Sequence, residues 1–254
     1  MINVFYDGTF EGFLTLLSKY VLEEEALDNI KIKNFRFTQP QGELFYEEVV
    51  TNSEKARKFL QYLKKNLPKV FFEKIYTYYL CDHEMIEIPL IKTLKEIKKN
   101  PDIFQDFSRD EIIKLHKAEK SFYRERHRWF GFLRFIELPN RILFAKFEPK
   151  FNVLPKLWFH FIQRYPNEKL IIFDSLRNLI FLYKDRKKEM MWIDDLEIEI
   201  PLETDLFVML WRNYFFHIAL PERKSYERQR NKVPFRTRRF LPEFWNSNFN
   251  PSIL

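Results

Sequence analysis

Glycine is scarce in this chain, with four residues among 254. At the average usage of about 7%, a chain of this length would contain several times as many. Loops that cradle the phosphates of nucleotides need several glycines close together, because only a residue without a side chain lets the backbone come so near a phosphate. The scarcity therefore excludes a P-loop and a dinucleotide-binding Rossmann fingerprint.

Cysteine is scarcer still, since the sequence contains Cys81 alone. One thiol cannot build a disulfide framework, a zinc ribbon or an iron–sulfur cluster within the chain. We therefore expect a reducing, cytoplasmic environment, and we expect the chain to hold no cofactor of its own.

Long uncharged apolar stretches are missing as well. None approaches the roughly 18 residues of a membrane-spanning helix. Near its start the chain has a run of glutamates, Glu23 to Glu25, and it lacks the basic beginning and apolar centre of a signal peptide. The sequence thus predicts no membrane partner.

Aromatic side chains and basic charge, by contrast, are plentiful. The chain has 29 Phe, 12 Tyr and 5 Trp, which excludes disorder, because disordered chains are poor in aromatics. Residues 1–82 carry 11 basic and 12 acidic side chains, whereas residues 83–254 carry 32 and 24. The basic second part indicates an anionic partner such as nucleic acid, although a lysine-rich solvated surface would give the same balance.

The spacing of apolar residues predicts that residues 1–82 form a small α/β unit. Short apolar strands alternate with amphipathic stretches, each preceded by a residue that can begin a helix. The expected strands are residues 2–6, 31–37 and 44–50, with a turn at 40–42, and the expected helices follow Thr9, Ser53 and Pro68.

Residues 83–254 are predicted to form a basic α+β unit. Ser108 and Glu111 have the spacing of a capping box, which would begin a long helix ending near Phe130. Hairpins with short connections imply an antiparallel sheet with flanking helices, because a parallel pair needs a crossover. The expected elements are hairpins 132–138 with 142–147 and 170–173 with 179–183, a strand at 189–193, and helices at 84–99, 153–165 and 206–218.

The long helix after Ser108 carries a stripe of basic residues. At about 100° per residue, positions three and four apart share a face, and this face is opposite the apolar residues. A phosphate backbone would fit the stripe, since each cation can displace a condensed counterion, but a solvated helix face would look the same. The stripe consists of Lys117, Lys120, Arg124 and Arg128.

Two further features carry basic charge. Arg126 falls among the apolar residues of the same helix, so its guanidinium needs either a structural ion pair or a ligand. Residues 223–239 contain eight basic residues, interleaved aromatics and one acid, Glu227, a composition that suits phosphate contacts and base stacking. Besides the stripe, we predict nucleic-acid contacts by Arg134, Arg236, Arg238 and Arg239, with a solvated basic tail as the alternative.

No motif in the sequence reveals catalytic chemistry. The five histidines show no spacing that places two imidazoles on one ion, so no metal site is predicted. The candidates for a hydrolytic centre are His127, His160, Glu148 and Asp174, if the fold brings them together. The alternative is that these groups satisfy one another at a sheet edge, and whether the chain is an enzyme stays open.

Several stretches, taken in order, resemble a bacterial family of DNA-metabolism or DNA-repair proteins. The resemblance begins with residues 6–13, Tyr-Asp-Gly-Thr-Phe-Glu-Gly-Phe, and spans nearly the whole chain. Val233, Thr237 and Arg238 depart from it, where the family has a methionine and a Tyr-Trp pair. The other similar stretches are His127-Arg128 with 131–135, Phe147-Glu148-Pro149, His160-Phe161 with Arg164, 211–215 with Ile218, and Pro234, Arg236 and Leu241-Pro242-Glu243.

This resemblance implies a role in DNA repair or base modification, beside a separate radical S-adenosylmethionine protein. In some relatives the C-terminal region is fused to a uracil-DNA-glycosylase-like domain, so such a protein is a further expected partner. Cys81 fits this arrangement, because the cluster of a radical enzyme needs several cysteines, which another chain must supply. If the aromatic pair of the family stacks on a base, this chain, with Thr237 and Arg238 there, must stack differently or not at all, and the Arg238 guanidinium could replace the pair in part.

Three functions follow from the sequence. The first is a DNA-binding accessory protein of a repair or base-modification system. The second is a hydrolase or glycosylase-like enzyme that acts on nucleic acid through His127, His160 and Asp174. The third is a protein–protein adaptor without DNA contact.

Overall fold

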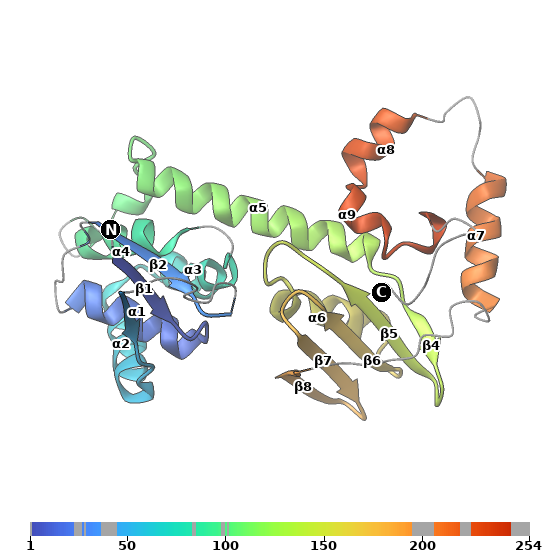
Figure 1. Ribbon diagram of the computed structural model, residues 1–254, viewed down its shortest axis with the longest axis horizontal. Helices are drawn as coiled ribbons and strands as arrows, with labels where there is room; N and C mark the ends of the chain where they lie inside the picture. Colours follow the sequence, from blue (N-terminus) through green and yellow to red (C-terminus); the bar gives the residue numbers. More distant parts are fainter. Residues whose placement is uncertain are drawn as a thin grey trace. The chain divides into compact units, whose positions relative to one another are not determined.

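The computed structural model divides into two compact units, residues 1–123 and 124–254. Figure 1 traces the helices and strands of both units, which we describe one at a time. The domain boundary expected between residues 82 and 83 stays a prediction. The structure describes residues 2–22, 27, 29–36, 45–82, 85–97, 100, 102–194, 206–218 and 225–244.

Unit 1 contains a three-stranded parallel sheet. Its strands are β1 (Ile2–Tyr6), β2 (Ile30–Asn34) and β3 (Tyr46–Val49), in the order β2-β1-β3. Both outer strands pair in parallel with β1, which is the most deeply buried of the three. The strands and the α/β character expected for this part are therefore confirmed, whereas the turn expected at 40–42 lies outside the described residues.

Helices complete unit 1 and begin where the apolar spacing predicts. The Thr9 hydroxyl accepts a hydrogen bond from the Gly12 amide at 2.9 Å and so caps the first helix. The second helix is capped by Asn52, one residue before the expected Ser53. The helices are α1 (Phe10–Leu22), α2 (Ser53–Asn66), α3 (Lys69–Leu80) and α4 (Glu87–Ile97), followed by a 3₁₀ turn at Ile103–Gln105 and the first part of α5 (Asp110–Phe132).

The loop between β1 and α1 depends on a glycine at position 12. Asp7 accepts hydrogen bonds from the Thr9 amide at 2.8 Å and from the Thr51 hydroxyl at 2.7 Å. A Cβ atom on Gly12 would lie 2.0 Å from the Asp7 carboxylate and 2.8 Å from the Thr51 hydroxyl. The carboxylate therefore occupies the space that a side chain would need.

Replacing Gly12 with alanine is expected to lower the free energy of unfolding of unit 1 by about 2 kcal/mol, because the new methyl group displaces Asp7 from its hydrogen bonds. Urea denaturation measures the change. Gly131→Ala is the matched control, since nothing lies within 4 Å of a Cβ there and alanine favours a helix by about 0.5–1 kcal/mol. Equal stabilities of the Gly12→Ala variant and the wild type would contradict this packing argument.

Unit 2 contains a five-stranded sheet of mixed direction. Its order is β4-β5-β6-β7-β8, and three of the four neighbouring pairs are antiparallel. The two expected hairpins and the additional strand are confirmed. The strands are β4 (Ile136–Leu138), β5 (Ile142–Phe147), β6 (Lys169–Asp174), β7 (Leu179–Lys184) and β8 (Lys187–Trp192).

The prediction of a purely antiparallel sheet is wrong at one pair, because β5 and β6 run parallel. The helix between the two hairpins, α6 (Leu154–Arg164), returns the chain across one face of the sheet, where it packs on β6 and β7 (Figure 1). A helix is the usual connection between parallel strands, so this segment turns two local hairpins into one mixed sheet.

Helices cover both faces of this sheet. On one face Trp158 of α6 stacks on Phe181 with ring centroids 5.2 Å apart, and Trp129 of α5 meets Phe147 at 5.0 Å. On the other face Val208 joins the buried cluster around Phe144. The remaining elements are α7 (Leu206–Ile218), α8 (Tyr226–Lys232), α9 (Phe235–Arg238) and a 3₁₀ turn at Pro242–Phe244.

The long helix that was expected to carry the basic stripe is present in the structure. The helix is confirmed as α5, although Ser108 donates to Asp106 and Glu111 pairs with Lys92, so these residues do not act as the expected capping box. Every helix in the described ranges is too short or too polar to cross a lipid bilayer.

Candidate functional site

Unit 2 contains a pocket of about 420 Å³ that is lined by aromatic rings and two arginines. The lining comes from the end of α5, the end of α6, helix α7 and the turn at Pro242. We call it the aromatic–arginine pocket. Its rings are Phe130, Phe135, Phe161, Tyr165 and Trp211, and its cations are Arg134 and Arg164.

One wall of the pocket is a set of rings that meet edge to face. The Phe135 ring lies 5.2 Å from that of Phe161 and 5.4 Å from that of Tyr165, measured between centroids. Phe161 is buried in the core, so the more accessible Phe135 packs against a fixed ring and in turn contacts Tyr165. Edge-to-face pairs of this kind are favourable and hold the rings in place.

A buried carboxylate organises two other side chains of the pocket lining. Glu243 accepts a hydrogen bond from Arg134 Nη2 at 2.8 Å and another from Trp211 Nε1 at 2.9 Å. The Arg134 guanidinium lies over the Trp211 ring, 5.3 Å from its centroid, and also donates to the Gly131 carbonyl. Because charge-assisted hydrogen bonds are strong, Glu243 fixes both side chains and neutralises Arg134.

Arg164 differs from Arg134 in its surroundings. It is the last residue of α6, it is exposed, and its guanidinium lies 5.7 Å from the centroid of the Tyr165 ring. Among the residues that the structure describes, no carboxylate forms an ion pair with it. The rim of the pocket therefore carries a positive charge that is available to an anionic ligand.

The two candidate histidines meet at Phe130, on the border of the pocket. The His160 ring stacks on Phe130 with centroids 4.3 Å apart, and the exposed His127 ring approaches it at 6.0 Å. Burial, and after it the charge of Arg164, lowers the pKa of His160 below its usual 6.5. His160 is therefore neutral at pH 7. The Arg126 guanidinium also lies near this ring, 5.4 Å from the Phe130 centroid.

The two candidate carboxylates lie together at the carboxyl ends of β5 and β6. Asp174 is fully buried, and it accepts hydrogen bonds from Arg177 Nη1 at 3.0 Å and from the Leu176 amide at 3.1 Å. Glu148 accepts from the Ser175 hydroxyl at 3.3 Å and pairs with Arg239. Since Asp174 is closed off from solvent, it lines no accessible cleft.

The histidines and carboxylates thus form two pairs with different neighbours. Within the described ranges, no group of three His, Cys, Asp or Glu side chains is arranged to hold a metal ion. The hydrolytic role suggested for His127, His160, Glu148 and Asp174 stays a prediction.

The basic residues expected at nucleic acid fall into two groups. Lys117 and Lys120 in unit 1, and Arg124 and Arg128 in unit 2, are exposed along α5. The arginines expected later in the chain have partners in the structure: Arg236 pairs with Glu125 at 2.7 Å, Arg239 pairs with Glu148, and Arg238 donates to the Val233 carbonyl and lies over Phe235. Their contact with nucleic acid stays a prediction, and Arg223, Lys224 and the side chain of Arg228 lie outside the described residues.

Sequence reasoning missed the acids that hold these arginines. Glu125 is buried, and it also accepts from the Lys150 and Phe151 amides at 2.8 Å, so one carboxylate joins α5 to the loop before α6. Glu243 stood in a motif but was assigned no partner. Arg164 and Trp211 also stood in motifs and were assigned no role. The order of these motifs along the chain was the one signal that the residues belong to a common site.

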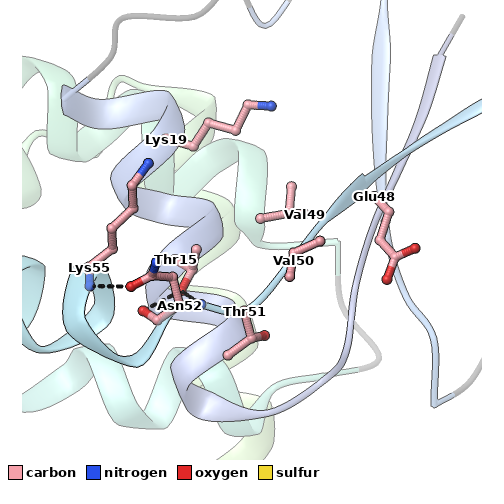
Figure 2. Close-up of a pocket in the computed structure, with 8 residues that line it drawn as sticks. All are labelled: Thr15, Lys19, Glu48, Val49, Val50, Thr51, Asn52 and Lys55. Carbon is pink, nitrogen blue, oxygen red and sulfur yellow. Dashed lines mark hydrogen bonds between the residues drawn. The ribbon is translucent and has the colours of Figure 1, made fainter.

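Unit 1 has a second hollow, of about 370 Å³, between α1, β3 and the start of α2 (Figure 2). Two lysines, Lys19 and Lys55, line it beside Glu48. Its other polar groups serve the fold, since Asn52 caps α2 and the Thr15 hydroxyl accepts from the Asn52 amide at 3.2 Å. The aromatic–arginine pocket has more groups that can contact a ligand, because its rings and the exposed Arg164 line the cavity.

Comparison with known proteins places this pocket within a family. Residues 84–243 match the family described as domain of unknown function DUF4130, a stretch that includes all the pocket residues. No curated protein sequence matches the chain.

Proposed function

Because the chain belongs to the DUF4130 family through residues 84–243, whose description assigns no activity, we propose a function from the site itself: the protein binds nucleic acid, as a DNA-binding accessory protein of a repair or base-modification system. The observation that carries the proposal is the aromatic–arginine pocket. It combines rings such as Phe135 and Tyr165 with the exposed cation of Arg164, which has no acidic partner among the described residues.

This combination matches the chemistry of nucleic acids. Stacking of a base on an aromatic side chain is worth about 1–3 kcal/mol and tolerates any base, because every base has a π face. A guanidinium offers a planar fork of donors to phosphate. The described residues that line the pocket include no carboxylate, thiol or imidazole, so the lining favours binding over acid–base chemistry.

The role in repair and the partners rest on the sequence resemblance. The motifs that resemble DNA-repair proteins contribute residues to all four segments of the pocket wall. These residues lie at 131–135, Phe161 with Arg164, Trp211 and Pro242. A radical S-adenosylmethionine protein and a uracil-DNA-glycosylase-like protein are the proposed partners. The chain has one cysteine, the buried Cys81, so in such a complex the partner would supply the cysteines of the cluster.

Binding of fluorescein-labelled single-stranded, duplex and uracil-containing oligonucleotides across a salt series tests the proposal. We expect affinity to fall with rising salt, as counterion release requires. The absence of binding to all three at low salt would overturn the proposed function.

The exposed arginines of α5 give a specific expectation. The double change Arg124→Ala and Arg128→Ala should flatten the plot of log affinity against log salt by about 1.8 on duplex DNA, or about 1.4 on a single strand, because two phosphate contacts are lost. Arg236 is unsuitable for this test, since its removal would disturb Glu125.

The matched control is Lys184→Ala with Lys187→Ala, which removes two exposed cations from the β7–β8 hairpin of the same unit. If the control pair and the arginine pair changed the slope equally, α5 would not be a specific contact surface.

A protein–protein adaptor is the second candidate, and helix α7 favours it. Large apolar side chains of this helix are exposed, among them Met209, Leu210, Tyr214 and Phe216, each more than half accessible. Exposed apolar patches of this kind often mark interaction surfaces. The adaptor becomes the leading function if no nucleic acid binds.

A further inference from the structure

We propose that the aromatic–arginine pocket seats one unpaired nucleotide, with its base against the rings of Phe135 and Tyr165 and its phosphate on Arg164. This inference rests on the proposed function and deepens it, because it names the form of nucleic acid that the protein prefers. It predicts preference for single strands and for bases that are out of the helix.

The size of the pocket supports one base. Its volume of about 420 Å³ falls at the lower end of the roughly 300–1,000 Å³ of small-molecule pockets. A base within a duplex is stacked on both faces and reaches a protein pocket only after it leaves the stack. A pocket of this kind therefore selects nucleotides that are already unpaired or that unpair at little cost.

Contacts within the protein fix the positions of the aromatic rings, so the site is preformed. Phe135 is held edge to face by Phe161, which is 2% exposed, and the same ring contacts Tyr165. The Arg134 and Trp211 side chains are fixed by Glu243. A preformed site loses little conformational entropy on binding, so the stacking energy is available to the base.

The two arginines of the pocket have different roles. Arg134 is neutralised by Glu243 and supports the wall, whereas Arg164 stands at the rim without an acidic partner among the described residues. Arg164 is thus the exposed cation of the pocket lining. One guanidinium beside an aromatic cavity fits a nucleotide, which has one phosphate for each base.

The experiment uses the full chain and DNA oligonucleotides that carry one 2-aminopurine, whose fluorescence falls when it stacks on an aromatic ring. The probe is presented in a single strand, in a matched duplex, and opposite a mismatch. We expect quenching with the single strand and the mismatch, and tighter binding of both than of the matched duplex.

Two variants test the assigned residues. Arg164→Ala should weaken single-strand binding about tenfold, because one charge-assisted contact is lost, and should weaken binding of the matched duplex less, because a paired base does not enter the pocket. Tyr165→Leu keeps apolar volume but removes a π face, so it should reduce the quenching. Lys184→Ala is the control for loss of one exposed cation elsewhere in unit 2, and circular dichroism checks that each variant is folded.

The outcomes separate the inference from the function. If DNA binds, but Arg164→Ala and Tyr165→Leu behave as the wild type does, the inference is wrong while the DNA-binding function stands. Equal affinity for single strand and matched duplex, without quenching, would overturn the inference in the same way. If no DNA binds at all, the proposed function fails and the inference fails with it.

Discussion

Replacing Arg177 with methionine is expected to lower the free energy of unfolding of unit 2 by about 3–5 kcal/mol, the usual cost of leaving one partner of a buried ion pair alone. The Arg177 and Asp174 side chains are 2% and 0% exposed, and their charged atoms lie 3.0 Å apart. Arg177 also donates to the carbonyls of Pro149 and Lys150, at 3.1 and 2.6 Å. Urea denaturation monitored by tryptophan fluorescence gives the change.

Two companion variants sharpen this test. Lys184→Met, on an exposed strand end of the same unit, should change stability by less than about 0.5 kcal/mol. The double change Arg177→Met and Asp174→Leu should recover only part of the loss, because an apolar pair can replace a buried ion pair but the Pro149 and Lys150 carbonyls still lack their donor. A single Arg177→Met variant as stable as the wild type would show that the pair contributes nothing.

Replacing Glu87 with glutamine is expected to stabilise unit 1 by about 3 kcal/mol at pH 8, and to have little effect at pH 4. Burial raises the pKa of Glu87 from 4.5 to about 7, and the Tyr6 hydroxyl donates to its carboxyl group at 3.3 Å. A pKa that is higher in the folded state means that folding favours the protonated form. The wild type therefore loses stability between about pH 4.5 and pH 7 and stays at the lower value above that range.

Glutamine keeps the shape and the hydrogen bond but cannot ionise, so the variant should show a flat profile over this range. Urea denaturation at several pH values measures both proteins. Glu73→Gln, an exposed change on α3, is the control and should leave the wild-type profile in place. Parallel profiles for wild type and Glu87→Gln would contradict this account of the buried carboxyl.

The sequence sufficed for most individual elements, because their signals are local. Apolar residues three and four apart predicted α5 and α6, and alternating strands with short turns predicted both hairpins of unit 2. The direction of β5 relative to β6 could not be predicted from local spacing, because more than 20 residues, including α6, separate the two strands along the chain. Periodicity within a segment carries no information on that choice.

The candidate site was harder to predict, for a similar reason. Charge density along the chain indicated basic residues but not their acidic partners, because Arg134 and Glu243 are 109 positions apart and Arg236 and Glu125 are 111 apart. Asp174 was expected as a candidate for a hydrolytic centre, and only the fold reveals that it is buried in an ion pair with Arg177. The aromatic residues of the lining belong to separate motifs. The family resemblance gave the order of these motifs along the chain but not their proximity in the fold.

The position of Glu243 has a consequence for how the protein is made. Chains leave the ribosome with their N-terminal parts first and fold as they emerge. Arg134 and Trp211 are synthesised well before Glu243, so both wait for the acceptor that orients them. The arrangement of Arg134 and Trp211 is thus completed only after residue 243 has been synthesised. A nascent chain that is interrupted before that residue has the rings and the cations but not the carboxylate that arranges them.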